Sequence, residues 1–407
     1  MNADGRTDPP TPEATPKRIA RASDLALYGA PPAYAEPLHV GRPNIGDRQR
    51  FLDYTNELLD RRWLTNNGPL VQELERRLAD YLGVRHVIAL CNGTIALEIA
   101  IRALGLKGEV ILPSYTFVAT AQALLWQEIT PVFADIDPVT HNLDPAAVER
   151  MITPRTSGII GVHLWGRAAA VDELSEIARS RQLALMFDSA HAFGASYRGR
   201  RVGAFGRAEV FSFHATKFFN TFEGGAITTN EDELATTMRY MRNFGFETYD
   251  KAVHLGTNGK MPEICAAMGL VNLDALDAVI AANRRNHEAY CGVLNDIPGL
   301  RVLPYDPREH SNFQYVVVEL APGFAVPRDR VIEALHAENI LARRYFWPGC
   351  HNMRPFRELY PHAGLLLPNT AVVAERVIVL PTGTALPEGA VVTIAAVFRA
   401  LMGDARR

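Results

Sequence analysis

The chain has 407 residues, of which 48% are hydrophobic and 21% are charged, and its formal net charge is −3. This composition is typical of a globular protein, and it argues against nucleic-acid binding, which normally requires a basic surface. No apolar run is long enough to span a membrane. Residues 1–24 are polar and proline-rich and lack the apolar core of a signal peptide. We therefore predict a flexible N-terminal tail and a cytoplasmic protein.

Short apolar runs alternate with helical patterns between about residues 65 and 230. Strands that are apolar throughout and separated by helices predict a mostly parallel sheet with both faces covered. The expected fold is a three-layer α/β/α domain, in which ligands bind beyond the carboxyl ends of the strands. The candidate strands are 86–90, 109–113, 131–136, 158–163, 183–188, 209–214 and 225–230, with helix patterns such as 94–104 and 170–182 between them.

The last third of the chain has a different pattern. A long helical stretch over 262–294 precedes new strand signals at 313–320 and 375–383, with helix patterns over 328–340 and 389–401. This order predicts a smaller α+β domain at the C-terminus. We predict a tail over residues 1–24, a large domain over 25–285 and a small domain over 286–407.

Neither the cysteines nor an acidic pair predicts a metal site. The four cysteines are scattered without paired spacing, which favours free thiols over a disulfide framework or a zinc site. Asp135 and Asp137 have no further ligands at metal spacing, and we interpret them as turn residues at a strand end. The cysteines are Cys91, Cys265, Cys291 and Cys350.

Three chemically different groups follow the ends of predicted strands. Asp188 ends the strand in "LMFD", Lys217 lies just beyond "FSFH", and the helix after "LCNGT" begins at Gly93 and Thr94. The carboxyl ends of parallel strands meet at one edge of a sheet, so these groups are expected to lie close together. Each also has a purely structural alternative: a cap or ion pair for Asp188, a packed aliphatic stem for Lys217, and an ordinary helix start at Gly93.

Lys217 stands among aromatic residues in a chain that has only five lysines. Burial lowers the pKa of an amine and leaves it neutral and nucleophilic, which arginine cannot become. A helix N-terminus binds anions, and Ser212 adds a hydroxyl beside it. An amine, a carboxylate and an anion site together match the aldehyde, the pyridine nitrogen and the phosphate of pyridoxal 5'-phosphate.

Six motifs carry a family resemblance: "CNGTIAL", "PSYTFVATAQAL", "PVFADIDPVTHNLDP", "FDSAHAFGA", "FSFHATK…EGGA" and "GTNGKMPEICAAMG". In this order they resemble the pyridoxal-phosphate-dependent nucleotide-sugar aminotransferases of the DegT/StrS type, over about residues 40–400. The resemblance implies the aspartate aminotransferase fold, PLP fold type I. It also implies that Lys217 bonds to the cofactor and moves the proton, that Asp188 pairs with the pyridine nitrogen, and that Gly93, Thr94 and Ser212 hold the phosphate.

Further roles follow from the same resemblance. Phe117 would stack on the cofactor ring, and His191, where the family often has glutamine, would lie beside its phenolic oxygen. Asn258 matches a residue that reaches the partner subunit's phosphate site, which implies a homodimer with shared active sites. Lys260 stands where the family often has arginine, so a salt bridge there is in doubt. Phe117 as simple core and Asn258 as a turn residue remain alternatives.

The loops "HLWGR", "NFGF" and "YFWPGCH" resemble those of members that aminate C4 of dTDP-4-keto-6-deoxy-D-glucose in antibiotic deoxysugar pathways. The implied donor is L-glutamate, and the implied product is dTDP-4-amino-4,6-dideoxy-D-glucose. Arg284, Arg343 and Arg344 are candidates for binding the substrate diphosphate, and Tyr345 lies on the same loop as the last two. Alternatives are a 3-keto nucleotide-sugar aminotransferase and a non-catalytic sensor or scaffold with this fold.

Overall fold

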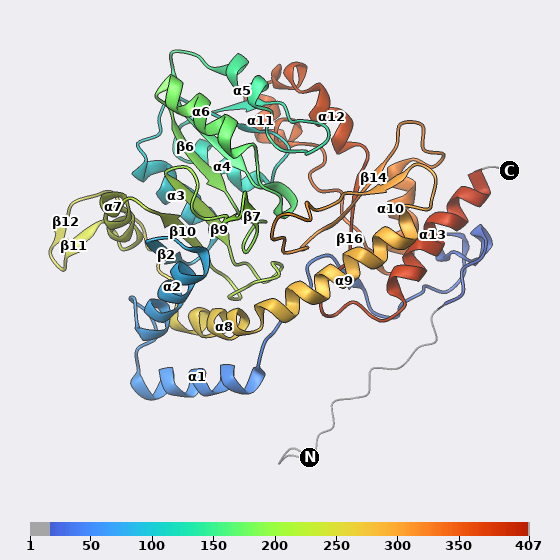
Figure 1. Cartoon of the computed structure of the whole chain (residues 1–407), viewed down its shortest axis with the longest axis horizontal. Coiled ribbons are helices and arrows are strands. Elements are labelled where there is room, and N and C mark those ends of the chain that lie inside the picture. Colours follow the sequence, from blue (N-terminus) through green and yellow to red (C-terminus); the bar gives the residue numbers. More distant parts are fainter. Residues whose placement is uncertain (1–16, 406–407) are drawn as a thin grey trace.

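The computed structural model describes residues 17–405 and is built around one seven-stranded sheet (Figure 1). The strand order is β2-β10-β9-β6-β5-β3-β4. β10 is antiparallel to both of its neighbours, and the other adjacent pairs are parallel. The strands are β2 (His86–Leu90), β3 (Glu109–Pro113), β4 (Thr130–Ala134), β5 (Thr156–Val162), β6 (Ala184–Asp188), β9 (Ala208–Ser212) and β10 (Gly225–Thr229).

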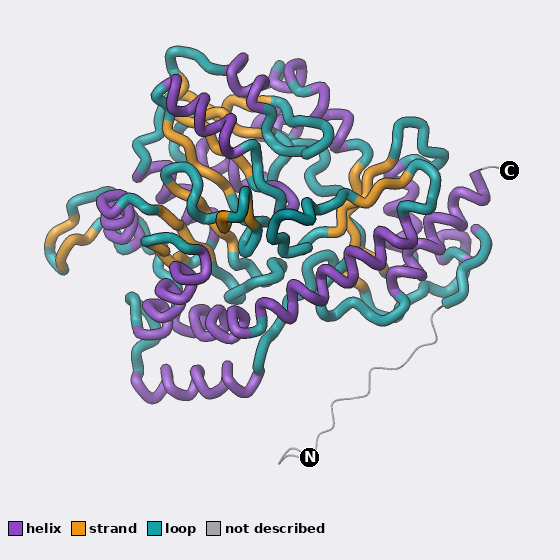
Figure 2. Tube along the Cα trace, in the orientation of Figure 1, coloured by secondary structure: helices purple, strands orange, loops and turns teal. Residues whose placement is uncertain are grey.

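Helices cover both faces of this sheet, and Figure 2 shows its strands lying between them. One buried core contains residues of α3 (Gly93–Ala103), α4 (Val118–Leu125) and α7 (Asp232–Arg242). The other contains residues of α2 (Pro69–Leu82), α5 (Pro145–Met151), α6 (Val171–Arg181) and α8 (Glu263–Asp274), and α1 (Arg48–Arg61) packs on α8. The predicted three-layer fold with a mostly parallel sheet is confirmed.

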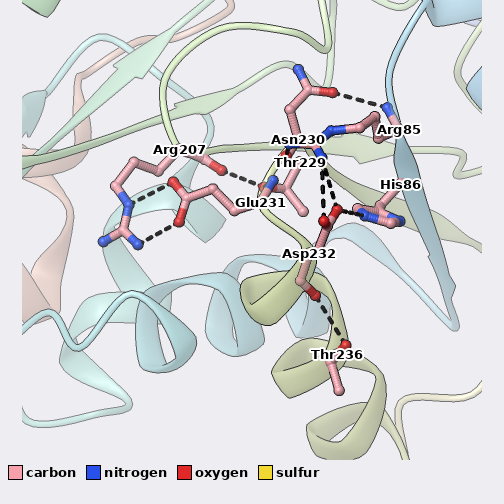
Figure 3. A network of polar contacts seen from close by, with 8 residues as sticks. All are labelled: Arg85, His86, Arg207, Thr229, Asn230, Glu231, Asp232 and Thr236. Atoms are coloured by element: carbon pink, nitrogen blue, oxygen red, sulfur yellow. Dashed lines mark hydrogen bonds and ion pairs between the residues drawn. The ribbon is translucent and has the colours of Figure 1, made fainter.

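A polar network fixes the three strands at one side of the sheet (Figure 3). Asp232, at the start of α7, accepts hydrogen bonds from Arg85 and from His86 Nε2, which lie at the start of β2. Arg207, just before β9, forms a two-point ion pair with Glu231. Exposed pairs of this kind contribute about 1 kcal/mol or less each. These contacts link β2, β9 and β10 at the end of the sheet where β2 and β9 begin and β10 ends.

The C-terminal elements form a small domain with its own core around a three-stranded antiparallel sheet. Its order is β13 (Leu300–Val302), β14 (Val316–Leu320) and β16 (Val377–Leu380). Packed on it are α9 (Leu276–Leu294), α10 (Arg328–Ala337) and α13 (Ala390–Ala405). α9 spans the predicted domain boundary, because its first turns contribute to the large core and its last turns, with Tyr290 and Leu294, to the small one.

The N-terminal segment packs differently from what we predicted. Residues 1–16 of the predicted tail lie outside the described residues. Lys17 instead donates to the buried carboxylate of Glu338 at 2.9 Å, so the end of the predicted tail is anchored. Leu25 and Leu38, which we had assigned to the large domain, are buried in the core of the small domain. Apolar side chains at these two positions account for this packing.

The remaining elements are short or peripheral. β1 (Leu38–His39) pairs with β15 (Ile340–Leu341), β7 (Ser196–Tyr197) with β8 (Arg200–Arg201), and β11 (Phe246–Thr248) with β12 (Lys251–Ala252). α11 (Arg354–Leu359) and α12 (Pro368–Ala374) precede β16. Among the described residues, no single helix is both long and apolar enough to cross a membrane; only the bent pair α8–α9 has the length and composition, and α8 is packed in the large core.

The acidic pair has a structural role, and the cysteines form no disulfide. Asp137 Oδ1 accepts hydrogen bonds from the backbone of Val139 and Thr140, and Asp135 accepts from the first turn of α12 at Asn369 and Thr370. Turn and cap chemistry therefore explains both carboxylates. All four cysteines are free thiols.

Candidate functional site

A cavity of about 380 Å³ opens at the carboxyl ends of β2, β5, β6 and β9. β10 begins at the same edge because it runs antiparallel, so Gly225 pairs with both Leu90 and Ser212 there. Asn258 and Arg284 do not line the cavity. The predicted residues on its wall are Gly93, Thr94, Phe117, Asp188, His191, Ser212, Lys217, Arg343 and Tyr345.

Lys217 lies in the loop between β9 and β10, and its backbone N–H donates to His214 O at 2.8 Å. Burial lowers the pKa of its amine to about 8, although the negative charge of Asp188 opposes part of this shift. A substantial share of the amine is therefore neutral near pH 8. The neighbouring rings of Phe218 and Phe219 are buried in the core.

Asp188 ends β6 with both carboxylate oxygens hydrogen-bonded. Oδ2 accepts from Thr120 Oγ1 at 2.7 Å, and Oδ1 accepts from Ala190 N at 3.1 Å. Burial raises the pKa of this carboxyl, and the two donors and the Lys217 charge oppose the rise. Asp188 is thus oriented at the cavity wall and suited to a cationic N–H partner. Sequence reasoning missed Thr120, a residue of α4 whose partner Asp188 is 68 positions away in the sequence.

The N-terminus of α3 meets the sheet at unusually close range. Asn92 caps the helix by accepting from Ile95 N at 2.8 Å, and Gly93 and Thr94 form its first turn. A Cβ on Gly93 would lie 3.0 Å from Ser212 Cβ, and one on Gly225 would lie 2.7 Å from Gly93 N. Glycine at both positions lets three backbones converge. The result is a helix start open to an anion, with the Ser212 hydroxyl beside it.

Two ring-bearing residues complete this side of the cavity. Phe117 is 57% exposed and lies just before α4, so the interpretation of Phe117 as simple core was wrong. His191 is buried and stacks on Phe346 with ring centroids 5.6 Å apart, and Tyr315 lies 4.7 Å away. Burial holds the pKa of His191 well below its usual value, so the imidazole is neutral. Its Nδ1 has no hydrogen-bond partner within the described chain.

The small domain contributes the opposite wall. Arg343 and Tyr345 follow β15, with the Arg343 guanidinium 5.4 Å from the Tyr345 ring. Arg344 instead pairs with Asp329 at 3.2 Å. Arg284 lies on the outer side of α9 and pairs with Glu288 at 2.8 Å. Of the three candidate arginines, the structure brings only Arg343 to the cavity.

Asn258 and Lys260 follow the β11–β12 hairpin and do not line the cavity; Lys260 forms an isolated bridge with Leu90 at the end of β2. Asn258 is exposed and forms an isolated bridge with Asn243. Lys260 donates to Asn243 Oδ1 at 3.0 Å and lies 4.6 Å from the centre of the Phe244 ring. Lys260 therefore takes part in a hydrogen bond and a cation–π contact.

These residues fit pyridoxal phosphate. The glycine-lined start of α3 accommodates a phosphate, Asp188 is oriented for a pyridinium N–H, and the Lys217 amine has the lowered pKa that bond formation requires. The unpartnered Nδ1 of His191 is a further polar atom near the cavity. When bound, this cofactor supplies an electron sink that stabilises a carbanion next to nitrogen.

Comparison with known proteins assigns the family. Residues 46–399 match the DegT/DnrJ/EryC1/StrS aminotransferase family, and the chain belongs to it. A dTDP-4-amino-4,6-dideoxy-D-glucose transaminase of Escherichia coli is 37% identical over 358 residues, which cover 87% of this chain and 96% of that protein. A GDP-perosamine synthase of Caulobacter vibrioides is 38% identical over 327 residues, covering 79% of this chain and 87% of its own.

Among solved structures, DesI in the presence of its TDP-sugar product superposes with a TM-score of 0.88 at 50% identity. The match covers 95% of this chain and 97% of DesI. The family resemblance inferred from the six motifs is therefore confirmed, and the protein is a sugar aminotransferase by family. The relatives' names concern nucleotide sugars, and pyridoxal phosphate dependence is implied by the family.

Proposed function

We propose that this protein uses pyridoxal phosphate to transfer the amino group of L-glutamate to the C4 keto group of dTDP-4-keto-6-deoxy-D-glucose. The product would be dTDP-4-amino-4,6-dideoxy-D-glucose. The observation that carries the chemistry is a single cavity wall bearing a lowered-pKa lysine, an oriented aspartate and a glycine-lined helix start. The substrate is supported by the likeness to DesI, whose structure contains a TDP-sugar product, and to the E. coli transaminase.

The chain's own residues divide the work as follows. Lys217 Nζ, neutral in part near pH 8, accepts the proton from the donor's α-carbon and returns one to C4 of the sugar. Asp188, held by Thr120, presents its carboxyl group at the cavity wall for the pyridine nitrogen. The first N–H groups of α3 and the Ser212 hydroxyl bind phosphate. Arg343 is the cation available at the cavity for the sugar diphosphate.

Direct incubation tests this proposal. Purified protein with pyridoxal phosphate and L-glutamate is given either the 4-keto or the 3-keto nucleotide sugar, and the products are separated by mass spectrometry and NMR. We expect the 4-amino sugar, with Lys217→Ala inactive in parallel. Product from the 3-keto sugar alone would exclude the C4 assignment. A protein that stays colourless with the cofactor and gains no mass after borohydride treatment would instead favour the sensor or scaffold.

We further propose a homodimer in which Asn258 completes the phosphate site of the partner subunit. The proposal is supported by the exposure of Asn258, which does not line the cavity of its own chain. It follows the β11–β12 hairpin, which projects from the large domain (Figure 1). Co-expression of Lys217→Ala and Asn258→Asp chains tests it. Each variant alone is expected to be weak or inactive, whereas a mixed dimer contains one site with both native residues. No recovery of activity in isolated mixed dimers would rule out shared sites.

A further inference from the structure

One short segment, residues 38–46, contacts both the Lys217 loop and the strand that leads to Arg343; we call it the linking segment. Its first two residues pair with β15, Leu38 with Ile340 and His39 with Leu341, and Arg343 follows two positions later. Gly41 then passes directly over the residue before Lys217. A Cβ at Gly41, where φ is +76°, would lie 2.6 Å from Thr216 O.

Asn44 joins the two domains through both ends of its amide. The side chain is 5% exposed, and its Nδ2 donates to Phe218 O, the residue after Lys217, at 3.0 Å. Its Oδ1 accepts from Thr384 Oγ1 at 2.7 Å, in the loop that follows β16 of the small domain. Asn44 O accepts from Asn220 Nδ2 at 2.9 Å. One buried side chain therefore bonds to the lysine loop and to the small domain at once.

A second buried asparagine closes the network. Asn272 on α8 donates from Nδ2 to Asn220 O at 2.8 Å and accepts from Gly46 N at 2.9 Å. Asn44, Asn220 and Asn272 are all at most 5% exposed. Buried amides are costly when unpaired, so this network specifies one backbone arrangement around residues 216–221.

We propose that the linking segment sets the position of the Lys217 amine relative to Arg343, with Asn44 as the residue that joins the two sides. Asn44 does not line the cavity, so it acts as a positioning residue rather than a catalytic one. The significance of the two positioned groups rests on the proposed function. The geometry of the network is independent of the proposed function, because all of its hydrogen bonds join protein atoms.

Asn44→Asp is the sharpest test, because it places a carboxylate oxygen against Phe218 O while keeping the size of the side chain. The matched control is Asn286→Asp. Asn286 donates to Gly383 O at 3.0 Å and so supports the same small-domain loop without touching the lysine loop. We expect amide hydrogen exchange in peptides covering 213–222 and 340–347 to accelerate at least about fivefold in Asn44→Asp, the ratio for loss of one buried hydrogen bond. Asn286→Asp should leave 213–222 unchanged.

A second readout separates positioning from mere packing. The pH at which Lys217 is half-labelled by acetic anhydride should move in Asn44→Asp and stay fixed in Asn286→Asp. Unchanged exchange at 213–222, or equal effects in both variants, would overturn the proposal. If Asn44→Asp does not fold, Thr384→Val removes the hydroxyl donor to Asn44 Oδ1 from an exposed position and leaves the longer bond from the Thr384 backbone N–H at 3.4 Å. Unaltered exchange at 213–222 in that variant would also overturn the proposal. Both readouts are taken without turnover, so they remain decisive even if the proposed reaction is wrong.

Discussion

The lowered pKa of Lys217 makes a quantitative prediction about its reactivity in the cofactor-free protein. Burial lowers the pKa of this amine from 10.5 to about 8. At pH 7 the neutral fraction is then about 10%, against about 0.03% for an unperturbed lysine, a ratio of about 300. Because only the neutral amine attacks an electrophile, trace acetic anhydride should label Lys217 far faster at pH 7 than it labels a lysine with an unperturbed pKa.

The other lysines serve as internal standards in the same tube. Lys251 pairs with Glu247, which raises the pKa of its amine, and burial lowers the pKa of Lys260. Labelling between pH 6 and 11, quantified by mass spectrometry of the lysine peptides, should place the inflection of Lys217 near 8 and that of Lys251 above 10.5. Since the Asp188 charge raises the Lys217 pKa, Asp188→Asn should move the inflection further down.

Two results would refute this reasoning. An inflection of Lys217 near 10.5 in the native chain would mean that burial does not control its ionisation. An upward shift in Asp188→Asn would mean that the coupling between the two groups has the opposite sign. Labelling in denaturant, where all the amines should titrate together, is the control for intrinsic reactivity.

Three further predictions concern the same cavity. Lys217→Met removes an amine whose protonated form is disfavoured in the folded state. At pH 7 the free energy of unfolding of the cofactor-free protein should therefore rise by up to about 3 kcal/mol, and this gain should shrink as the pH rises towards 10.5. An equal gain at pH 7 and pH 10 in urea unfolding would contradict this. Thr120→Val removes a hydrogen-bond donor from Asp188, so the pKa of the Asp188 carboxyl should rise. Affinity for pyridoxal phosphate at pH 7, measured by fluorescence titration, should then fall about tenfold. Unaltered affinity would contradict this role of Thr120. Gly225→Ala would place Cβ 2.7 Å from Gly93 N, so phosphate-dependent affinity should fall about tenfold or more, whereas unphosphorylated pyridoxal should bind as before.

The sheet and much of the site could be predicted because their signals are local. Each strand of the large sheet is a short apolar run, and Asp188, Lys217 and the start of α3 follow directly from the strand ends. The parallel arrangement then brings those ends to one edge. Phe218 and Phe219 are apolar residues that follow a largely buried strand, and both are in the core.

Other features depend on partners that are distant in the sequence and carry no local signal. Thr120 resembles any helix residue until Asp188 is placed beside it. Leu25 and Leu38 read as the beginning of the large domain, yet only the folded chain reveals that their apolar surface is covered by C-terminal elements. Arg284 does not line the cavity of its own chain for a geometric reason. Asn283 before it is buried, and one further residue along the helix turns Arg284 to the exposed side of α9.

The reversed direction of β10 has a consequence for how the site is assembled during synthesis. β2 is the edge strand of the seven-stranded sheet, and β10 is the strand that pairs with it. Leu90 pairs with Gly225, and the elements from α3 to β9 lie between these two residues in the sequence. Distant pairings of this kind form slowly. The start of α3 and Lys217, the two groups that we propose hold the cofactor, are therefore brought together only when β10 joins the sheet. A nascent chain that ends before β10 leaves β2 without its partner strand, so under the proposed function the chain would gain its cofactor site only when the large sheet is complete.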